Sequence, residues 1–227
     1  IGSVFSRPKP IPPKDTQKTQ IINKPDSFDW REKGFVNPIR DQGACAAGYV
    51  FAMTQACESW YGYYHSFLPQ FSDQNLLDCS KESQGCVGGA LDNVISQIVH
   101  YQEGYLMYSS DYPYVGYKHD KCDFSFDKAI MVSINFMVGN YGDEERVAEF
   151  VTTGVCAATI DAEHASFQLY SKGIYDEPTC SSTRTTHGVG IVGYGSENGV
   201  DYWIVRNSWG AQWGEEGYIR MSRNKDN

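Results

Sequence analysis

Residues 41–52 read DQGACAAGYVFA, a run of small residues followed by an apolar one. Its small residues predict a tight turn, and the apolar residues that follow it open a pattern with helical spacing. Two further motifs lie far downstream, THGVG at residues 186–190 and RNSWG at residues 206–210. The three motifs contribute a glutamine, a histidine and an asparagine, all with polar side chains.

The three motifs together resemble those of the papain-like cysteine peptidases. In that family the first motif is Gln-Gly-x-Cys-x-x-Cys followed by an aromatic residue, and its second cysteine attacks the peptide carbonyl. Gly48 stands at the position of that cysteine, so the attacking side chain is missing from this chain. Ala46 and Ala47 also replace the Gly-Ser pair of many relatives, and Tyr49 replaces a tryptophan. The resemblance covers roughly residues 26–223.

The resemblance implies an α+β, papain-like fold of two halves with a groove between them. We expect residues 26–129 to form a mainly helical half that carries position 48. Residues 130–227 should form an antiparallel, β-barrel-like half that carries His187 and Asn207. A chain of 227 residues with 41 % apolar content is long enough for a core of this size.

Residues 1–25 differ in composition from the rest. They hold five prolines, five basic residues and one acidic residue. Such a composition suits polyproline or unstructured chain better than a packed element. We interpret the segment as a basic leader or propeptide remnant; alternatively, it lies across the acidic body near the groove.

The overall charge excludes some classes of partner. The net charge is −9, which argues against nucleic acid, because phosphate binding needs concentrated Lys and Arg. No apolar run approaches the ~18 to 20 residues that cross a bilayer, so no membrane span is predicted. Ile1 does not begin a signal sequence, and we expect any targeting segment to have been removed or left out.

Periodicity predicts the main elements. Apolar residues recur at helical spacing over residues 48–63, which predicts a buried central helix. Ser72 is a suitable N-cap for a second helix ending near Cys79, and residues 92–103 predict a third. Residues 28–31 and 36–40 should be extended. The later strands are expected at residues 130–134, 156–160, 188–194, 202–206 and 218–221.

Seven cysteines form an odd set, so at least one lacks a partner within the chain. The resemblance suggests two bridges, Cys45 with Cys86 and Cys79 with Cys122. Such bridges predict secretion or a lysosomal or vacuolar location. Cys180 would in many relatives pair with a cysteine near the carboxyl end.

Cys57 and Cys156 match none of the family's common bridging positions. We expect them to be buried thiols first, since free cysteine behaves as a small apolar residue. They could also pair with each other, or one of them could pair with Cys180. No Cys/His spacing fits structural zinc, and we predict neither a metal nor a cofactor.

By resemblance, His187 is the acid-base residue, Asn207 orients it and Gln42 donates to the oxyanion. The backbone N–H of Gly48 remains as the other oxyanion donor, and Trp209 shields the contact between Asn207 and His187. Each residue alone has an ordinary interpretation, such as a polar strand residue or a turn. Found together in the family's order, they indicate descent from a catalytic site.

Substrate contacts follow from the same resemblance. Gly88 and Gly89 look like the glycine pair that holds an extended peptide, because missing side chains permit close approach. The candidates to line the neighbouring pocket are Ala90, Leu91, Ala158 and Thr185. These residues predict a mainly apolar preference.

Two functions compete. The first is an inactive homologue that lacks the nucleophile and binds extended peptides, protein substrates or its own propeptide. The second is a genuine cysteine endopeptidase whose nucleophile has been changed to glycine at position 48 in this sequence. A structural or storage protein, which needs no groove, is a third class.

Overall fold

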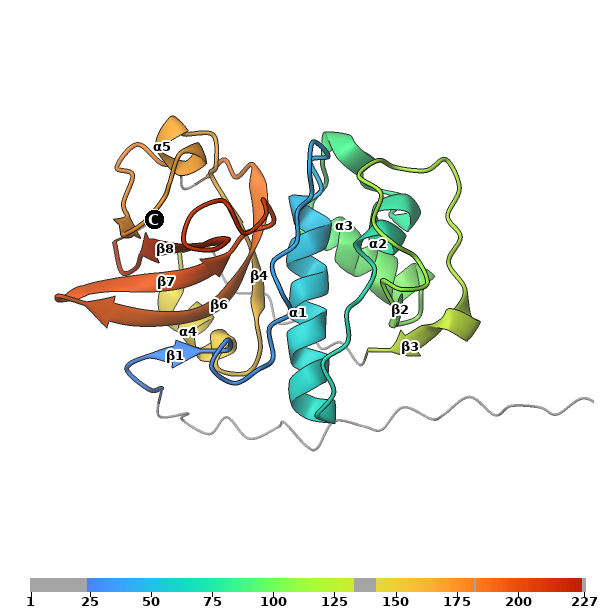
Figure 1. The fold of residues 1–227 in the computed structure, drawn as a ribbon, viewed down its shortest axis with the longest axis horizontal. Coiled ribbons are helices and arrows are strands. Elements are labelled where there is room, and N and C mark those ends of the chain that lie inside the picture. Colours follow the sequence, from blue (N-terminus) through green and yellow to red (C-terminus); the bar gives the residue numbers. More distant parts are fainter. Residues whose placement is uncertain (1–23, 133–141, 182, 226–227) are drawn as a thin grey trace, which may run out of the picture.

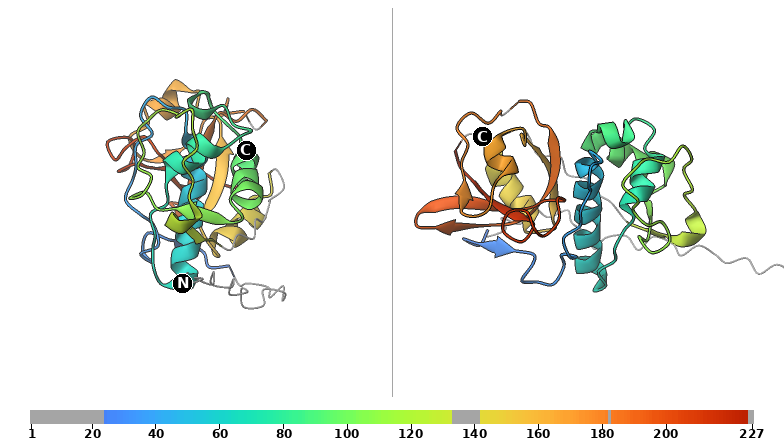
Figure 2. Two further views of the ribbon diagram at one scale, coloured as in Figure 1. Left: turned by 90° about the vertical axis from the view of Figure 1, so that its right-hand side faces the viewer. Right: turned by 45° about the horizontal axis from the view of Figure 1, so that its top comes forward.

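The computed structural model describes residues 24–132, 142–181 and 183–225. It consists of a mainly helical half and a sheet-rich half, and α1 stands between them (Figure 1). The right-hand view of Figure 2 shows the same order, with α1 between the sheet and the remaining helices. The leader predicted at residues 1–25 lies outside the described residues except for Lys24 and Pro25.

The helical half is built on α1, which runs from Gly48 to His65, two residues beyond its predicted end. The helix ends at Ser66, whose φ of 54° is left-handed. The other elements of the helical half are α2 (Asp73–Cys79), η1 (Gly85–Val87), α3 (Leu91–Ser96), η2 (Gln97–Tyr101), β2 (Tyr105–Met107), η3 (Phe126–Lys128) and β3 (Ala129–Met131). Ser72 caps α2 as predicted, because its Oγ accepts the N–H of Asn75 at 2.8 Å.

The expected helix over residues 92–103 is not continuous. It starts as α3 and continues as η2, a turn of π-helix. Glu103 and Gly104 then take φ values of 51° and 81°, which end the helical path. A wider turn at this point places the side-chain amides of Gln97 and Gln102 against each other.

Within the described residues, the other half is one sheet of six strands with two short helices. Its elements are β1 (Phe28–Asp29), α4 (Glu144–Val151), β4 (Cys156–Ile160), α5 (Ala165–Gln168), β5 (Ile174–Tyr175), β6 (His187–Glu197), β7 (Val200–Arg206) and β8 (Tyr218–Ser222). The strand order is β1-β6-β7-β8-β5, and β4 also pairs with β6. The α+β class expected from the sequence is therefore the observed one.

The division of the chain at residue 129 stays a prediction, and two segments cross it. Phe28 and Asp29, from the expected helical half, pair with Tyr194 and Gly193 in β6. Residues 129–131 pair with β2 and belong to the helical side. Of the strand predicted at residues 130–134, the last two residues lie outside the described part of the chain.

β6 approaches α1 very closely. A Cβ atom added at Gly188 would lie 2.8 Å from the carbonyl carbon and oxygen of Gly48 and from the Cα of Tyr49. Only glycine permits this contact, since real Cβ atoms do not approach backbone to that distance. The glycine after His187 therefore brings the start of β6 against the first turn of α1.

The two faces of β4 serve different cores. Cys156, Ala158 and Ile160 pack into the core of the sheet half, whereas Ala157 packs against the core around α1. Cys57 lies in the α1 core, so it and Cys156 are on opposite sides of the strand. Both are free thiols; Cys57 is buried, as expected, whereas Cys156 is only half-buried.

The structure contains both bridges suggested by the resemblance. Cys45 is bonded to Cys86 and Cys79 to Cys122. Cys180 is a free, half-buried thiol. Among the described residues, no helix is both long enough and apolar enough to cross a membrane.

Candidate active site

The first turn of α1 is held by the segment before it. Cys45 is joined to Cys86, and the N–H of Ala46 donates to the carbonyl of Cys86 at 3.1 Å. The helix then begins at Gly48, which is buried and contributes no side chain. Next to it lies the half-buried imidazole of His187, at the start of β6.

The imidazole of His187 fills the space that a side chain at position 48 would take. A Cβ atom added at Gly48 would lie 2.5 Å from both Nδ1 and Cε1 of His187. Position 48 and His187 are therefore in direct contact, with Nδ1 turned toward the helix. A larger residue at position 48 requires the ring to withdraw by about 0.9 Å to ordinary contact distance.

The hydrogen bonds of Asn207 fix the tautomer of His187. Asn207 Oδ1 accepts the N–H of Ser208 at 2.8 Å, so this atom is an oxygen and an acceptor. Nε2 of His187 lies 2.7 Å from the same Oδ1 and must carry the hydrogen that it donates. In the neutral ring, Nδ1 then presents its lone pair to position 48.

Burial favours the neutral form of the ring. Desolvation lowers the pKa of His187 below its usual 6.5, and the hydrogen bond to Asn207 opposes this only in part. A neutral imidazole with its lone pair toward α1 is the form that accepts a proton from a thiol at that position.

Asn207 and Trp209 surround this contact. Asn207 is fully buried, and its N–H donates to the carbonyl of Gly217 at 3.0 Å. Its Nδ2 has no hydrogen-bond partner within the described part of the chain. The ring centroid of Trp209 lies 5.0 Å from that of His187, so the indole covers the imidazole and limits its contact with water.

Gln42 is held from both ends. Its Oε1 accepts the hydroxyl of Ser208 at 2.6 Å, and its Nε2 donates to the carbonyl of Cys45 at 2.8 Å. One of the two hydrogens on Nε2 is thus used, and the other is available near the first turn of α1. The structure therefore brings Gln42, Gly48, His187 and Asn207 together.

Comparison with known proteins identifies the family. The family described as papain family cysteine protease matches residues 24–227. The chain belongs to the papain family of cysteine proteases. It is 42 % identical over 210 residues to cathepsin L of Sarcophaga peregrina, covering 91 % of this chain and 61 % of that protein.

The chain is also similar to a second curated relative and to a solved structure of the papain family. Cathepsin L1 of Drosophila melanogaster is 41 % identical over 210 residues, covering 91 % of this chain and 56 % of the relative. The solved structure of digestive procathepsin L 3 from Tenebrio molitor larval midgut superposes with a TM-score of 0.81 at 38 % identity, covering 90 % of this chain and 66 % of that one. The chain thus spans about three fifths of the length of the curated relatives that it matches.

The glycine pair expected to hold substrate in this papain-family chain has two different environments. Gly88 has a φ of 135° and open space where a Cβ would be. A Cβ at Gly89 would instead meet Ser83 Oγ and Tyr49 Cε2, both at 2.6 Å. Gly88 is open to an approaching backbone, whereas packing alone accounts for the glycine at position 89.

The expected pocket residues are only partly brought together. Ala90 is exposed and precedes α3, and Leu91, its first residue, packs against the α1 core. Thr185 is exposed just before β6. Ala158 does not reach this surface, since it packs into the core of the sheet half.

Thr159, which the sequence analysis missed, takes the place that Ala158 was expected to fill. It is exposed, and it pairs with Gly188, the residue that touches the first turn of α1. Residues 156–160 read CAATI, all small or apolar except one, so no alternation marked which face was outward. No group of three metal-binding side chains occurs among the described residues.

Proposed function

We propose that this papain-family chain binds extended peptides and does not cleave them. The observation that carries the proposal is the absence of any side chain between α1 and Nδ1 of His187. A thiol peptidase requires a thiolate there, and loss of a catalytic nucleophile costs about 10⁶-fold in turnover. Cys45 is committed to a disulfide, and burial raises the pKa of Cys57 to about 12, so neither replaces it.

Peptide binding needs none of the missing chemistry. The backbone N–H of position 48 and the second N–H of Gln42 suit a carbonyl oxygen, and Gly88 leaves room for a peptide backbone. Leu91, Thr159 and Thr185 are our candidates to contact its side chains. The partners we propose are peptides or proteins in extended form and the chain's own propeptide. Two disulfides support a secreted, lysosomal or vacuolar location.

A second function is favoured by the condition of the site. His187 has its lone pair turned toward position 48 and is hydrogen-bonded to Asn207. Gln42 is held by its hydrogen bond with Ser208. The same chain with a cysteine at position 48 would be a cysteine endopeptidase. The codon for position 48 in the native gene decides between the two, since a cysteine codon identifies Gly48 as a later replacement.

The test compares three versions of position 48. The chain as it stands should bind an extended peptide in calorimetry and hydrolyse no fluorogenic peptide. Gly48→Cys should hydrolyse that peptide about 10⁴- to 10⁶-fold faster. Gly48→Ala is the matched control, because it adds the same Cβ contact with His187 and no thiol.

Three results would contradict the proposal. Hydrolysis by the unchanged chain that a thiol reagent abolishes would show a nucleophile elsewhere. Calorimetry without heat for extended peptides would remove the binding function. An inactive, folded Gly48→Cys variant would contradict the roles given to His187 and Gln42.

A further inference from the structure

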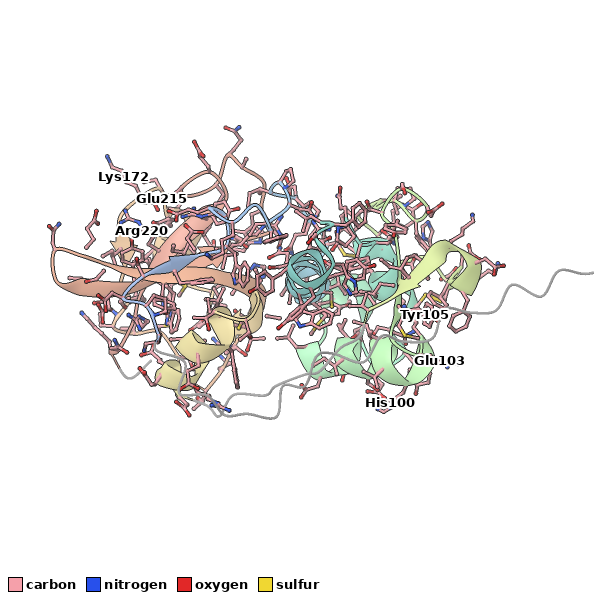
Figure 3. All side chains as sticks on the ribbon, turned by 90° about the horizontal axis from the view of Figure 1, so that it is seen from below. His100, Glu103, Tyr105, Lys172, Glu215 and Arg220 are labelled. Atoms are coloured by element: carbon pink, nitrogen blue, oxygen red, sulfur yellow. A yellow bond between two sulfur atoms is a disulfide. The ribbon has the colours of Figure 1, made fainter. Side chains whose placement is uncertain are left out.

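A cavity of about 350 Å³ lies in the helical half, beside the disulfide between Cys79 and Cys122. Its walls come from the end of α2, from η2 and from residues 118–124. Figure 3 shows this half from below, with His100 and Tyr105 marking the neighbourhood of η2. The volume is at the lower end of the range of small-molecule sites, about 300–1,000 Å³. None of the residues proposed for catalysis lines the cavity.

Gln97 supplies a buried acceptor that lacks a donor. Its side chain lines the cavity and is only 3 % exposed. Its Nε2 donates to Oε1 of Gln102 at 3.2 Å, and Nε2 of Gln102 donates to Asn75 Oδ1 at 3.0 Å and to the carbonyl of Tyr105 at 2.8 Å. Both hydrogens of the Gln102 amide are used, so its Oε1 must accept and the Gln97 amide cannot be reversed. Oε1 of Gln97 then has no partner among the described residues, which is costly for a buried atom.

Two ammonium groups stand at the same cavity. The stem of Lys118 packs onto Gly85, where an added Cβ would lie 2.5 Å from its Cδ. Nζ of Lys81 lies 4.1 Å from the centroid of the Tyr101 ring. Neither lysine forms an ion pair with any residue in the described ranges. The cavity therefore presents two positive charges that a carboxylate can bind.

The carboxylates at the cavity differ in their availability. Asp78 is already occupied, because it accepts from Gln74 Nε2, from the hydroxyl of Tyr112 and from the N–H and ring of His119 at 2.7–2.9 Å. Asp120 is exposed and pairs with no cation in the described part of the chain. One free carboxylate and one side chain with an unpaired amide oxygen thus line the same cavity as the two lysines, and both oxygens suit an ammonium donor.

This combination matches one class of small molecule. Positive and negative groups are both present, and Tyr101, which is 43 % exposed, adds an aromatic surface together with Phe124. We infer that the cavity binds a free α-amino acid with an aromatic side chain. Lys81 and Lys118 hold its carboxylate, and Gln97 Oε1 and Asp120 hold its ammonium group.

The experiment uses the full chain and three probes of nearly the same shape. L-Phenylalanine carries both charges, 3-phenylpropionate lacks the ammonium group and 2-phenylethylamine lacks the carboxylate. Calorimetry and NMR titration should show phenylalanine binding at least about tenfold more tightly than either analogue, since each loses a charged hydrogen bond. Shifts should centre on the amides of residues 97–102 and 118–124.

Two lysine variants locate the site. Lys118→Met should weaken the binding of phenylalanine and 3-phenylpropionate about tenfold and leave 2-phenylethylamine unchanged. Lys121→Met is the matched control, because Lys121 lies on the same loop, pairs with Asp123 and does not line the cavity. It should change nothing.

Three outcomes overturn the inference. Equal affinities for the three probes would contradict a preference for a molecule that carries both charges. Equal affinities of the Lys118 and Lys121 variants for phenylalanine would contradict binding at this cavity. No heat and no shift with any probe means that the cavity holds water alone. Because binding at the groove does not depend on Lys118, failure of the peptide-binding proposal leaves this measurement unaffected.

Discussion

At Gly188 the backbones of the two halves are in direct contact, and an alanine there should force them apart. Its Cβ would lie 2.8 Å from three backbone atoms of the first turn of α1. Ordinary contact begins near 3.4 Å, so β6 and α1 must separate by about 0.6 Å. Backbone in a buried helix cannot rotate away as a side chain can, and overpacking of this kind costs about 1–3 kcal/mol.

The cost can be read as a melting temperature. In a protein of this size, 1 kcal/mol shifts the Tm by roughly 2–4 °C, so Gly188→Ala should melt about 2–12 °C below the unchanged chain. Gly154→Ala is the matched control. Its Cβ would lie 3.7 Å from Trp60, in ordinary contact, and its φ is outside the left-handed region. That variant should melt at or slightly above the unchanged chain, because alanine restricts the unfolded state.

Calorimetry on the three chains, with circular dichroism to establish that each is folded, measures both effects. If Gly188→Ala melts as high as Gly154→Ala, the close approach of β6 to α1 does not limit packing. The explanation for the glycine after His187 would then be wrong.

Two further predictions concern titratable groups. The pKa of His187 in the folded chain lies below 6.5, so its contribution to stability is fully present above pH 6.5 and is lost as the pH falls toward the folded pKa. His187→Gln should therefore show a weaker dependence of the free energy of unfolding on pH, measured by urea unfolding between about pH 5 and 7. Burial raises the pKa of both Cys57 and Cys156 to about 12, so brief alkylation of the native chain should modify Cys180 alone, as peptide mass spectrometry would show. If the free energy of unfolding of His187→Gln depends on pH as steeply as that of the unchanged chain, the argument on His187 is wrong. If Cys57 is alkylated as early as Cys180, the argument on the buried thiols is wrong.

The elements that sequence predicted well are those set by local patterns. The α1 helix follows from its apolar spacing, and α2 follows from the Ser72 cap, whose hydrogen bond reaches only three residues along the chain. The helix expected over residues 92–103 failed for a non-local reason. Its π turn coincides with the contact of Gln102 with Asn75, which lies 27 residues away in sequence. Periodicity carries no information about such a partner.

The site shows the same limit. The motifs identified which residues meet, and the structure brings Gln42, Gly48, His187 and Asn207 together. The position of the ring could not be read from sequence, because it depends on the space left by the glycine. The error at Ala158 arose because a strand of small residues does not reveal which face is buried.

The survival of the site residues is weak support for catalysis, because the fold uses them as well. Asn207 Oδ1 accepts the N–H of Ser208, and Gln42 ties Ser208 Oγ to the carbonyl of Cys45. Each such buried bond contributes about 1 kcal/mol, and removing one partner leaves the other unpaired at greater cost. A chain without a nucleophile would therefore still be destabilised by losing Asn207 or Gln42. Position 48 makes no side-chain hydrogen bond of this kind. Its identity in the native gene is therefore the stronger evidence on whether the protein is a peptidase.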